Sequence, residues 1–210
     1  MLGGLLLSGL LIATACKRNE AKGQSGSGTN TTVRTEDTER EQARFDAERR
    51  PEKVVEALGI KPGSKVADVG AGSGLLTVHL ARAVRPNGKV VATDIDEGVL
   101  ELMQQRLQNA GLAEYVERKV VAADTPGLEK GEYDAILLAE VDHYFSDPVM
   151  WLKTAAESLK PGGRIVISNR IHHRTKSISA ATKAGLKTII EATPVPTHFI
   201  AVFVVPEASK

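Results

Sequence analysis

Residues 66–74, VADVGAGSG, constrain the fold more than any other stretch, because three glycines directly follow an apolar, strand-like run. An apolar stripe with helical spacing then covers residues 75–84 and ends at RPNG. A strand, a glycine turn and a helix in this order aim backbone N–H groups at a helix N-terminus, a general site for anionic or polar ligand groups. The stretch therefore predicts a ligand-binding turn within an α/β fold.

The spacing of the glycines excludes two common nucleotide-binding turns. Gly70, Gly72 and Gly74 read G-x-G-x-G, whereas a dinucleotide-binding turn reads G-x-G-x-x-G and would need a glycine where Leu75 stands. A P-loop is excluded because no Gly-Lys-Ser/Thr follows. Asp68 stands two residues before the first glycine and completes the string D-x-G-x-G-x-G.

Strand and helix patterns alternate along most of the chain. Strands are expected at residues 65–69, 89–93, 115–121, 133–139, 164–169, 186–196 and 197–205, and helices at 50–58, 75–84, 96–110, 148–160 and 177–185. Such alternation predicts a parallel sheet covered by helices on both faces. The last two strands have only a short Pro-containing link, so they must be antiparallel neighbours. We expect a mostly parallel sheet with one antiparallel strand near its edge.

The composition is that of one ordinary globular domain with an N-terminal extension. The chain has 210 residues and a formal net charge of +1, which gives no indication of a nucleic-acid partner. A single cysteine, Cys16, excludes an intramolecular disulfide and a cysteine-based zinc site. Adjacent side chains diverge on a strand, so His172 and His173 do not predict a metal site either.

The N-terminus is typical of an exported protein. Residues 1–15 form an uncharged apolar run that is short for a membrane span, and Ala13 to Cys16 resemble the lipobox of bacterial lipoproteins. We therefore expect a signal peptide over residues 1–16, a flexible polar linker over 17–42 and the folded domain over 43–210. Lipidated Cys16 would anchor the protein to a membrane of the bacterial envelope. The alternatives are an uncleaved signal anchor, or a misread start site and a cytoplasmic protein.

Five segments together resemble the class I S-adenosylmethionine-dependent methyltransferases. They are KPGSKVADVGAGSG, VVATDID, VAAD, YDAILLAEVDHY and SLKPGGRIVIS, in the order and spacing of that family. The resemblance implies a Rossmann-like, seven-stranded, mostly parallel sheet with one antiparallel strand, and S-adenosylmethionine as the cofactor. It also disfavours a nicotinamide-dependent oxidoreductase, as the glycine spacing does.

The resemblance also assigns roles to individual residues. The cofactor-binding positions are Asp68, Gly70, Gly72, Gly74, Asp94, Ile95, Asp124 and Glu140. The glycines let the backbone approach the methionine part of the cofactor, near which Asp68 and Glu140 are also expected. Asp94 accepts the ribose hydroxyls, Ile95 flanks the adenine, and Asp124 accepts from the adenine amino group. Alternatively, Asp68 braces the turn through hydrogen bonds, and Asp124 is a turn residue without a ligand contact. Asp96 is expected to cap the next helix.

The acceptor side of the site is less well defined. His143 and Tyr144 stand where many relatives carry two adjacent histidines, and His143 is the candidate general base for an acceptor that arrives protonated. Ser168 and Asn169 stand where relatives often have an acid. The expected function is methyl transfer to an unidentified small molecule, and the alternative is a catalytically inactive binding or scaffold protein. The oligomeric state stays open.

Overall fold

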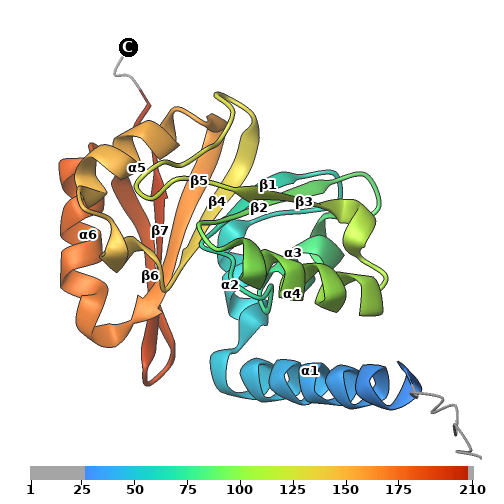
Figure 1. The fold of residues 1–210 in the computed structure, drawn as a ribbon. Helices are drawn as coiled ribbons and strands as arrows, with labels where there is room; N and C mark the ends of the chain where they lie inside the picture. The colour runs from blue at the N-terminus through green and yellow to red at the C-terminus, as the bar shows by residue number, and fades with distance from the viewer. Residues whose placement is uncertain (1–26, 208–210) are drawn as a thin grey trace, which may run out of the picture.

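The computed structural model describes residues 27–207, which form a seven-stranded sheet flanked by helices (Figure 1). The strands are β1 (Lys65–Val69), β2 (Lys89–Asp94), β3 (Val116–Val120), β4 (Tyr133–Ala139), β5 (Leu159–Arg170), β6 (Lys187–Val195) and β7 (His198–Val204). The helices are α1 (Ser27–Arg49), α2 (Pro51–Leu58), α3 (Thr77–Val84), α4 (Glu97–Asn109), α5 (Pro148–Ala156) and α6 (Arg174–Lys183), with short 3₁₀ turns η1 (Ala113–Tyr115), η2 (Asp142–Tyr144) and η3 (Ile171–His173).

The strand order is β3-β2-β1-β4-β5-β7-β6, and the sheet confirms the predicted fold. Only β7 runs against the others, because it pairs antiparallel with both β5 and β6. The chain leaves β1 toward β2 and β3 on one side, then returns to β4 and β5 on the other. In open sheets of this kind, ligands bind at the carboxyl ends of the strands where the order switches. The switch here lies between β1 and β4.

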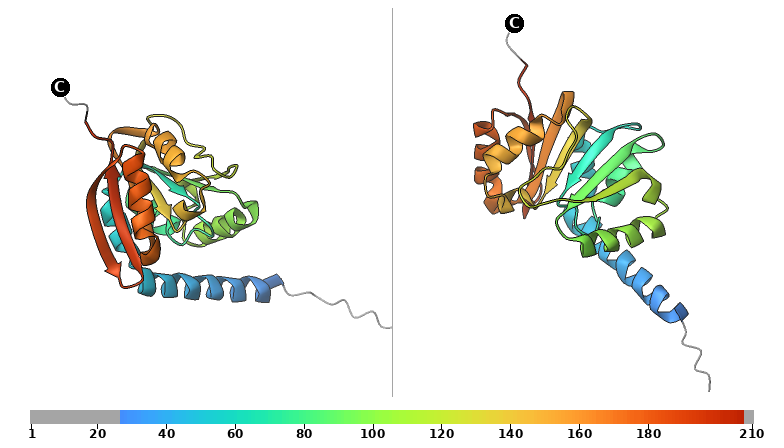
Figure 2. Two further views of the ribbon diagram at one scale, coloured as in Figure 1. Left: turned by 90° about the vertical axis from the view of Figure 1, so that its left-hand side faces the viewer. Right: turned by 45° about the horizontal axis from the view of Figure 1, so that its top comes forward.

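Helices cover the two faces of the sheet with separate apolar cores. Figures 1 and 2 show α2, α3 and α4 on one face, and α5 and α6 on the other. Val66 of β1 packs with the first group and its neighbour Ala67 with the second, as the alternation of side chains along a strand requires. Both residues have no exposed surface. This rigid two-sided core fixes where β1 ends and the glycine turn begins.

The helix α1 corrects the linker prediction. The sequence predicts a flexible segment up to residue 42, but residues 27–42 belong to a helix that continues to Arg49 and extends beyond the body of the domain (Figure 2). Hydrogen bonds hold the polar part of this helix against the domain: the buried Arg106 of α4 donates to the backbone oxygen of Thr38 and to Gln42 Oε1, each at 3.2 Å. Composition alone does not reveal such partners, since they are distant in sequence.

The predicted signal peptide, Cys16 and residues 17–26 of the predicted linker lie outside the described residues. Within residues 27–207, none of the helices is long and apolar enough to cross a membrane.

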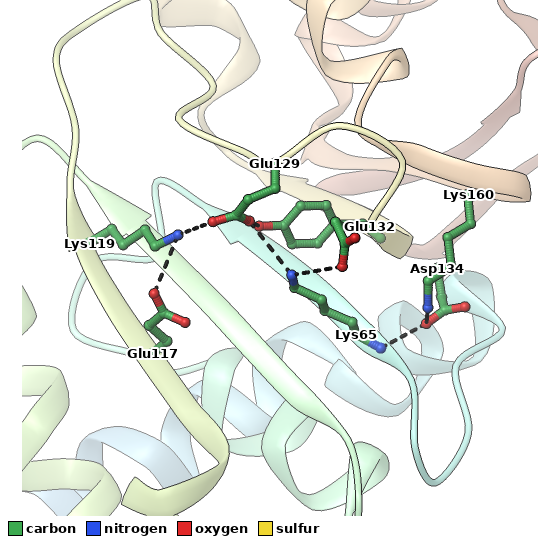
Figure 3. Close-up of polar contacts among 8 residues, drawn as sticks. Lys65, Glu117, Lys119, Glu129, Glu132, Asp134 and Lys160 are labelled. Carbon is green, nitrogen blue, oxygen red and sulfur yellow. Dashed lines mark hydrogen bonds and ion pairs between the residues drawn. The ribbon is translucent and has the colours of Figure 1, made fainter.

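A cluster of ionic side chains anchors the connection between β3 and β4 (Figure 3). Glu129 in this connection accepts from Lys119 Nζ at the end of β3 and from the Tyr133 hydroxyl at the start of β4. Lys65 Nζ of β1 lies 3.3 Å from Glu132 in the same connection. The cluster thus fixes the far end of a loop whose first residues, 121–125, form one wall of the candidate site.

Candidate functional site

Two neighbouring cavities open at the carboxyl ends of the central strands. The first, here called the large cavity, has a volume of about 420 Å³ and lies against the ends of β1, β2, β3 and β4. The second, here called the glycine-turn cavity, has a volume of about 160 Å³ and lies against the turn between β1 and α3. Gly70 and Glu140 line both cavities. These two residues therefore mark the junction between them.

The glycine turn has the backbone conformation and the close packing that exclude other residues. Gly70, Gly72 and Gly74 all have positive φ angles, of 64°, 55° and 84°. A Cβ on Gly70 would lie 2.5 Å from Val141 Cγ2, and one on Gly74 would lie 2.6 Å from Met103 Cγ. A Cβ on Gly72 would meet no atom within 4 Å, so Gly72 presents its backbone to open space. The turn thus packs tightly on both sides and is open in its middle.

Asp94, at the end of β2, ties the glycine turn to the large cavity. Its Oδ2 accepts from the backbone N–H of Gly72 at 2.9 Å, and its Oδ1 accepts from that of Asp96 at 3.1 Å. Each carboxylate oxygen still has a second lone pair for a ligand hydroxyl. Ile95 is 66% exposed and also lines the large cavity. Asp96 caps α4 as predicted, because its side chain accepts from the Gly98 and Val99 backbone N–H groups.

Asp68 lies in the wall of the glycine-turn cavity with only 2% of its surface exposed. Its Oδ2 accepts from the Thr77 hydroxyl at 2.7 Å, so the side chain braces the start of α3 against the end of β1. Burial raises the pKa of Asp68 to about 7, and the nearby charge of Asp94 adds to this, although the hydrogen bond from Thr77 opposes it. Asp68 thus combines the bracing role with a position at the cavity.

Glu140 follows β4 with a φ of 53° and is surrounded by two arginines and a histidine. Its carboxylate pairs with Arg49 at the end of α1 and lies 3.3 Å from Arg170 Nε and 3.2 Å from His198 Nε2. Burial acts to raise the pKa of Glu140, but the charge of Arg49 and the other donors outweigh it and hold the pKa below its usual value. Glu140 is therefore an anion already compensated by the protein.

Asp124 lies at the rim of the large cavity, where it joins two loops. Both carboxylate oxygens accept from Ser146, from its backbone N–H at 2.8 Å and from its hydroxyl at 2.6 Å. The hydrogen bond from the Ser146 hydroxyl, followed by that from the backbone, lowers the pKa of Asp124. The side chain is exposed and keeps free lone pairs, so its predicted contact with adenine stays a prediction.

The two predicted catalytic residues line different cavities. Tyr144 lines the large cavity and is 76% exposed. His143 lines a third cavity of about 160 Å³ instead, here called the His143 cavity, and its ring stacks on His173 with centroids 4.2 Å apart. Asn169 Nδ2 lies 2.9 Å from His143 Nδ1. The rings of His143 and Tyr144 nevertheless contact each other, with centroids 4.1 Å apart, so the pair lies at the boundary between the two cavities.

The predictions missed Phe45 and Arg49, which line the glycine-turn cavity from α1. Arg49 lies over the Phe45 ring at 5.5 Å from its centroid, and it also pairs with Glu140. No sequence motif indicates a functional role for these two residues, because they directly follow a polar segment whose composition is typical of a linker. Together they give the glycine-turn cavity a cationic and aromatic wall.

The residues present fit S-adenosylmethionine. The size of the large cavity lies in the range of small-molecule sites, and the glycine-turn cavity adjoins it at Gly70 and Glu140. The hydroxyl of Thr93 is buried at the large cavity without a hydrogen-bond partner, which a ligand atom would supply. Gly72 leaves the open space that a cofactor would fill. Across residues 27–207, by contrast, no three His, Cys, Asp or Glu side chains gather as metal ligands would.

Comparison with known proteins agrees with this geometry. Residues 67–165 match the family model described as a methyltransferase domain. A ubiquinone/menaquinone biosynthesis C-methyltransferase from Cronobacter sakazakii is 30% identical over 114 residues, which are 54% of this chain and 45% of that protein. The chain thus spans less than half the length of the curated relatives it matches.

Solved structures share the fold. An S-adenosylmethionine-dependent methyltransferase from Aquifex aeolicus superposes with a TM-score of 0.71 at 22% identity, over 78% of this chain and 93% of that one. The geranyl diphosphate C-methyltransferase from Streptomyces coelicolor, solved with S-adenosyl-L-homocysteine, gives a TM-score of 0.63 at 15% identity, over 75% and 78% of the two chains. The chain therefore has the class I S-adenosylmethionine-dependent methyltransferase fold, and its residues 67–165 are similar to a methyltransferase domain.

Proposed function

We propose that the protein is an enzyme that transfers a methyl group from S-adenosylmethionine to a small-molecule acceptor. The observation that carries this proposal is the pair of cavities that meet at Gly70 and Glu140, with the Asp94 carboxylate held at the wall by the glycine turn. A cofactor with an adenosine at one end and an amino acid at the other needs two such compartments. The matched methyltransferase domain supports the same reaction class.

The chain's own residues supply binding and orientation. Asp94 has free lone pairs for the ribose hydroxyls, and the largely apolar large cavity, with Ile95 at its edge, suits the adenine. In the glycine-turn cavity, Asp68 offers an acceptor for the ammonium group, and Arg49 a donor for the carboxylate. S-adenosylmethionine supplies an electrophilic methyl group when bound. Catalysis then mostly requires that the acceptor atom is held in line at near-attack distance.

The acceptor side keeps His143 and Tyr144 as candidates, with different expected roles. Tyr144 lies at the large cavity, where its ring and hydroxyl suit contact with the acceptor. His143 lies in the separate His143 cavity, so it acts on the acceptor only if the acceptor reaches that far. A base is needed when the acceptor is a hydroxyl or an ammonium group, and not for an atom that already has a free lone pair.

A methyl-transfer assay tests the proposal. The full chain is incubated with cofactor labelled in its methyl group and a panel of small phenols, amines, thiols and carboxylic acids. Labelled product from wild type, and much less from Asp94→Ala at a low cofactor concentration, is the expected result. Cofactor binding without any labelled product would instead favour the inactive binding or scaffold protein. Absence of both binding and product would remove S-adenosylmethionine from the account.

We also propose that Cys16 is lipidated and anchors the chain to a membrane. The supporting pattern is the apolar run before the cysteine, which lies outside the described residues. S-adenosylmethionine is made in the cytosol, so an exported enzyme would need another source of this cofactor. Metabolic labelling with a palmitate analogue, comparing wild type with Cys16→Ser, tests it. Unlabelled wild-type protein in the cytosolic fraction would favour the cytoplasmic alternative.

A further inference from the structure

The His143 cavity adjoins the large cavity but is not part of it. Phe145 lines both cavities, and its ring stacks on Trp151 with centroids 4.3 Å apart. The polar wall of the His143 cavity comes from η2, which follows β4, and from His173 of η3 and the first turns of α6, which follow β5. A molecule bound beside Tyr144 in the large cavity could therefore extend past Phe145 into the His143 cavity.

Hydrogen bonds fix which atoms His143 presents. The Asn169 Oδ1 atom accepts from the Arg170 backbone N–H at 2.7 Å, which orients the amide. Asn169 Nδ2 therefore donates, to Asp142 Oδ1 at 2.7 Å and to His143 Nδ1 at 2.9 Å. With Nδ1 accepting, the neutral ring carries its proton on Nε2. His143 thus presents an N–H donor to any ligand at Nε2, which does not fit the general-base role expected from the sequence.

The carboxylate in this wall is already satisfied. Asp142 is buried, with 5% of its surface exposed, and besides Asn169 it accepts from the Ser177 hydroxyl at 2.5 Å. Two short hydrogen bonds stabilise its charge, so no ligand donor is required. Asp142 consequently acts to orient Asn169, and through it the His143 ring.

The remaining charge at the His143 cavity is positive. His173 and Lys176 line it from the segment RIHHRTK, residues 170–176, which contains no acidic residue. Arg170 is paired with Glu140, and Arg174 with Glu191. Lys176 lines the cavity and, within the described part of the chain, has no ion pair or hydrogen bond from its ammonium group. The same cavity is therefore lined by a lysine without a partner among the described residues and by a histidine whose Nε2–H is fixed.

We propose that the His143 cavity binds an anionic group of the methyl acceptor, a carboxylate or a phosphate, through Lys176 Nζ and His143 Nε2–H. The inference rests on the proposed function, and it narrows the acceptor class to small acids. The volume of about 160 Å³ suits one such group and not a whole acceptor. The rest of the molecule then lies beside Tyr144, toward the junction of the two cofactor cavities.

The test is a titration of the full chain with inorganic phosphate and, separately, with acetate. Binding is monitored through the NMR signals of the histidine rings. Saturable shifts of His143 are expected with at least one anion, and the stronger of the two identifies the chemistry of the acid. Lys176→Gln removes one charge-assisted hydrogen bond and is expected to weaken the response about 10- to 100-fold. Lys183→Gln, on the same helix but away from the cavity, is the matched control and should leave it unchanged.

Several outcomes separate this inference from the proposed function. Both lysine variants weakening the response equally would mean that only bulk charge attracts the anion, and would overturn the inference. Calorimetric binding of S-adenosyl-L-homocysteine, with no shift of the His143 NMR signals on addition of either anion, would overturn the inference and leave the proposed function intact. An anion response without cofactor binding would remove the proposed function, and the acceptor role of the cavity with it. Once an acceptor is known, Lys176→Gln should raise KM and leave kcat nearly unchanged.

Discussion

Asp68 should make the protein less stable as the pH rises from about 4 to 7, and Asp68→Asn should abolish that dependence. The carboxyl is buried, and its pKa rises from 3.8 to about 7 in the folded chain. Between these values the unfolded chain loses the proton while the folded chain keeps it. The stability that this group contributes is thus complete below about pH 4 and is lost as the pH rises through 7.

The magnitude follows from the same two values. A gap of about 3 pH units at about 1.4 kcal/mol each corresponds to a loss of about 4 kcal/mol in the free energy of unfolding across that range. The asparagine side chain in Asp68→Asn is nearly isosteric, can still accept from the Thr77 hydroxyl and does not titrate. The free energy of unfolding of the variant should therefore exceed that of wild type increasingly from pH 4 to 7.

Urea denaturation at several pH values measures the effect. The single tryptophan, Trp151, is buried and reports unfolding by fluorescence. Glu114→Gln, which removes an exposed carboxylate, is the control and should follow the wild-type profile. Parallel profiles for wild type and Asp68→Asn would show that the Asp68 carboxyl is ionised in the folded chain, and would refute the reasoning.

Further predictions concern the turn, the ribose acceptor and the ionic cluster. Asp94→Ala should weaken binding of S-adenosyl-L-homocysteine about 10- to 100-fold by calorimetry, because a charged acceptor is lost; unchanged affinity would remove Asp94 from the site. Gly74→Ala should lower the free energy of unfolding, measured in urea, by about 1 to 3 kcal/mol, since its Cβ would lie 2.6 Å from Met103 Cγ. The same substitution should cost less in a protein that also carries Met103→Ala. An equal cost in both backgrounds would contradict the steric cause. The hydrogen bonds of Glu129, first that from Lys119, lower its pKa to about 2. The stability that ionised Glu129 contributes is present above about pH 4.5 and is lost as the pH falls toward 2. Because the side chain is 46% exposed, Glu129→Gln should lower the free energy of unfolding by about 1 kcal/mol or less at pH 6. An equal loss of stability at pH 2 would contradict this electrostatic cause.

Local signals in the sequence predicted the fold and the positions of the glycine turn and Asp94 at the carboxyl ends of two neighbouring strands. Alternating strands and helices predict a parallel sheet, and the short link between the last two strands predicts the reversed β7. The glycine turn directly follows β1, and Asp94 is the last residue of β2. Their positions are predictable because the sheet fixes where each of these strands ends. Asp96 was predictable as a helix cap for the same reason, since its partners are its immediate neighbours.

Contacts between distant segments could not be predicted in this way. Residues 27–42 have a polar composition typical of a flexible linker, and the partners that hold that part of α1, Arg106 on α4 and the Leu75 backbone oxygen, are distant in sequence. Arg49 reaches Glu140 across 91 residues of sequence. The direction of the His143 ring depends on Asn169, whose amide is in turn oriented by backbone. Partners of this kind exist only once the sheet is assembled.

Calorimetric titration of the full chain with S-adenosyl-L-homocysteine tests the central claim most directly. We predict saturable binding of one molecule per chain, with affinity reduced at least tenfold in Asp94→Ala and unchanged in Glu114→Gln. Absence of any binding heat to wild type at several temperatures, confirmed by equilibrium dialysis, would contradict the assignment of the two cavities to the cofactor.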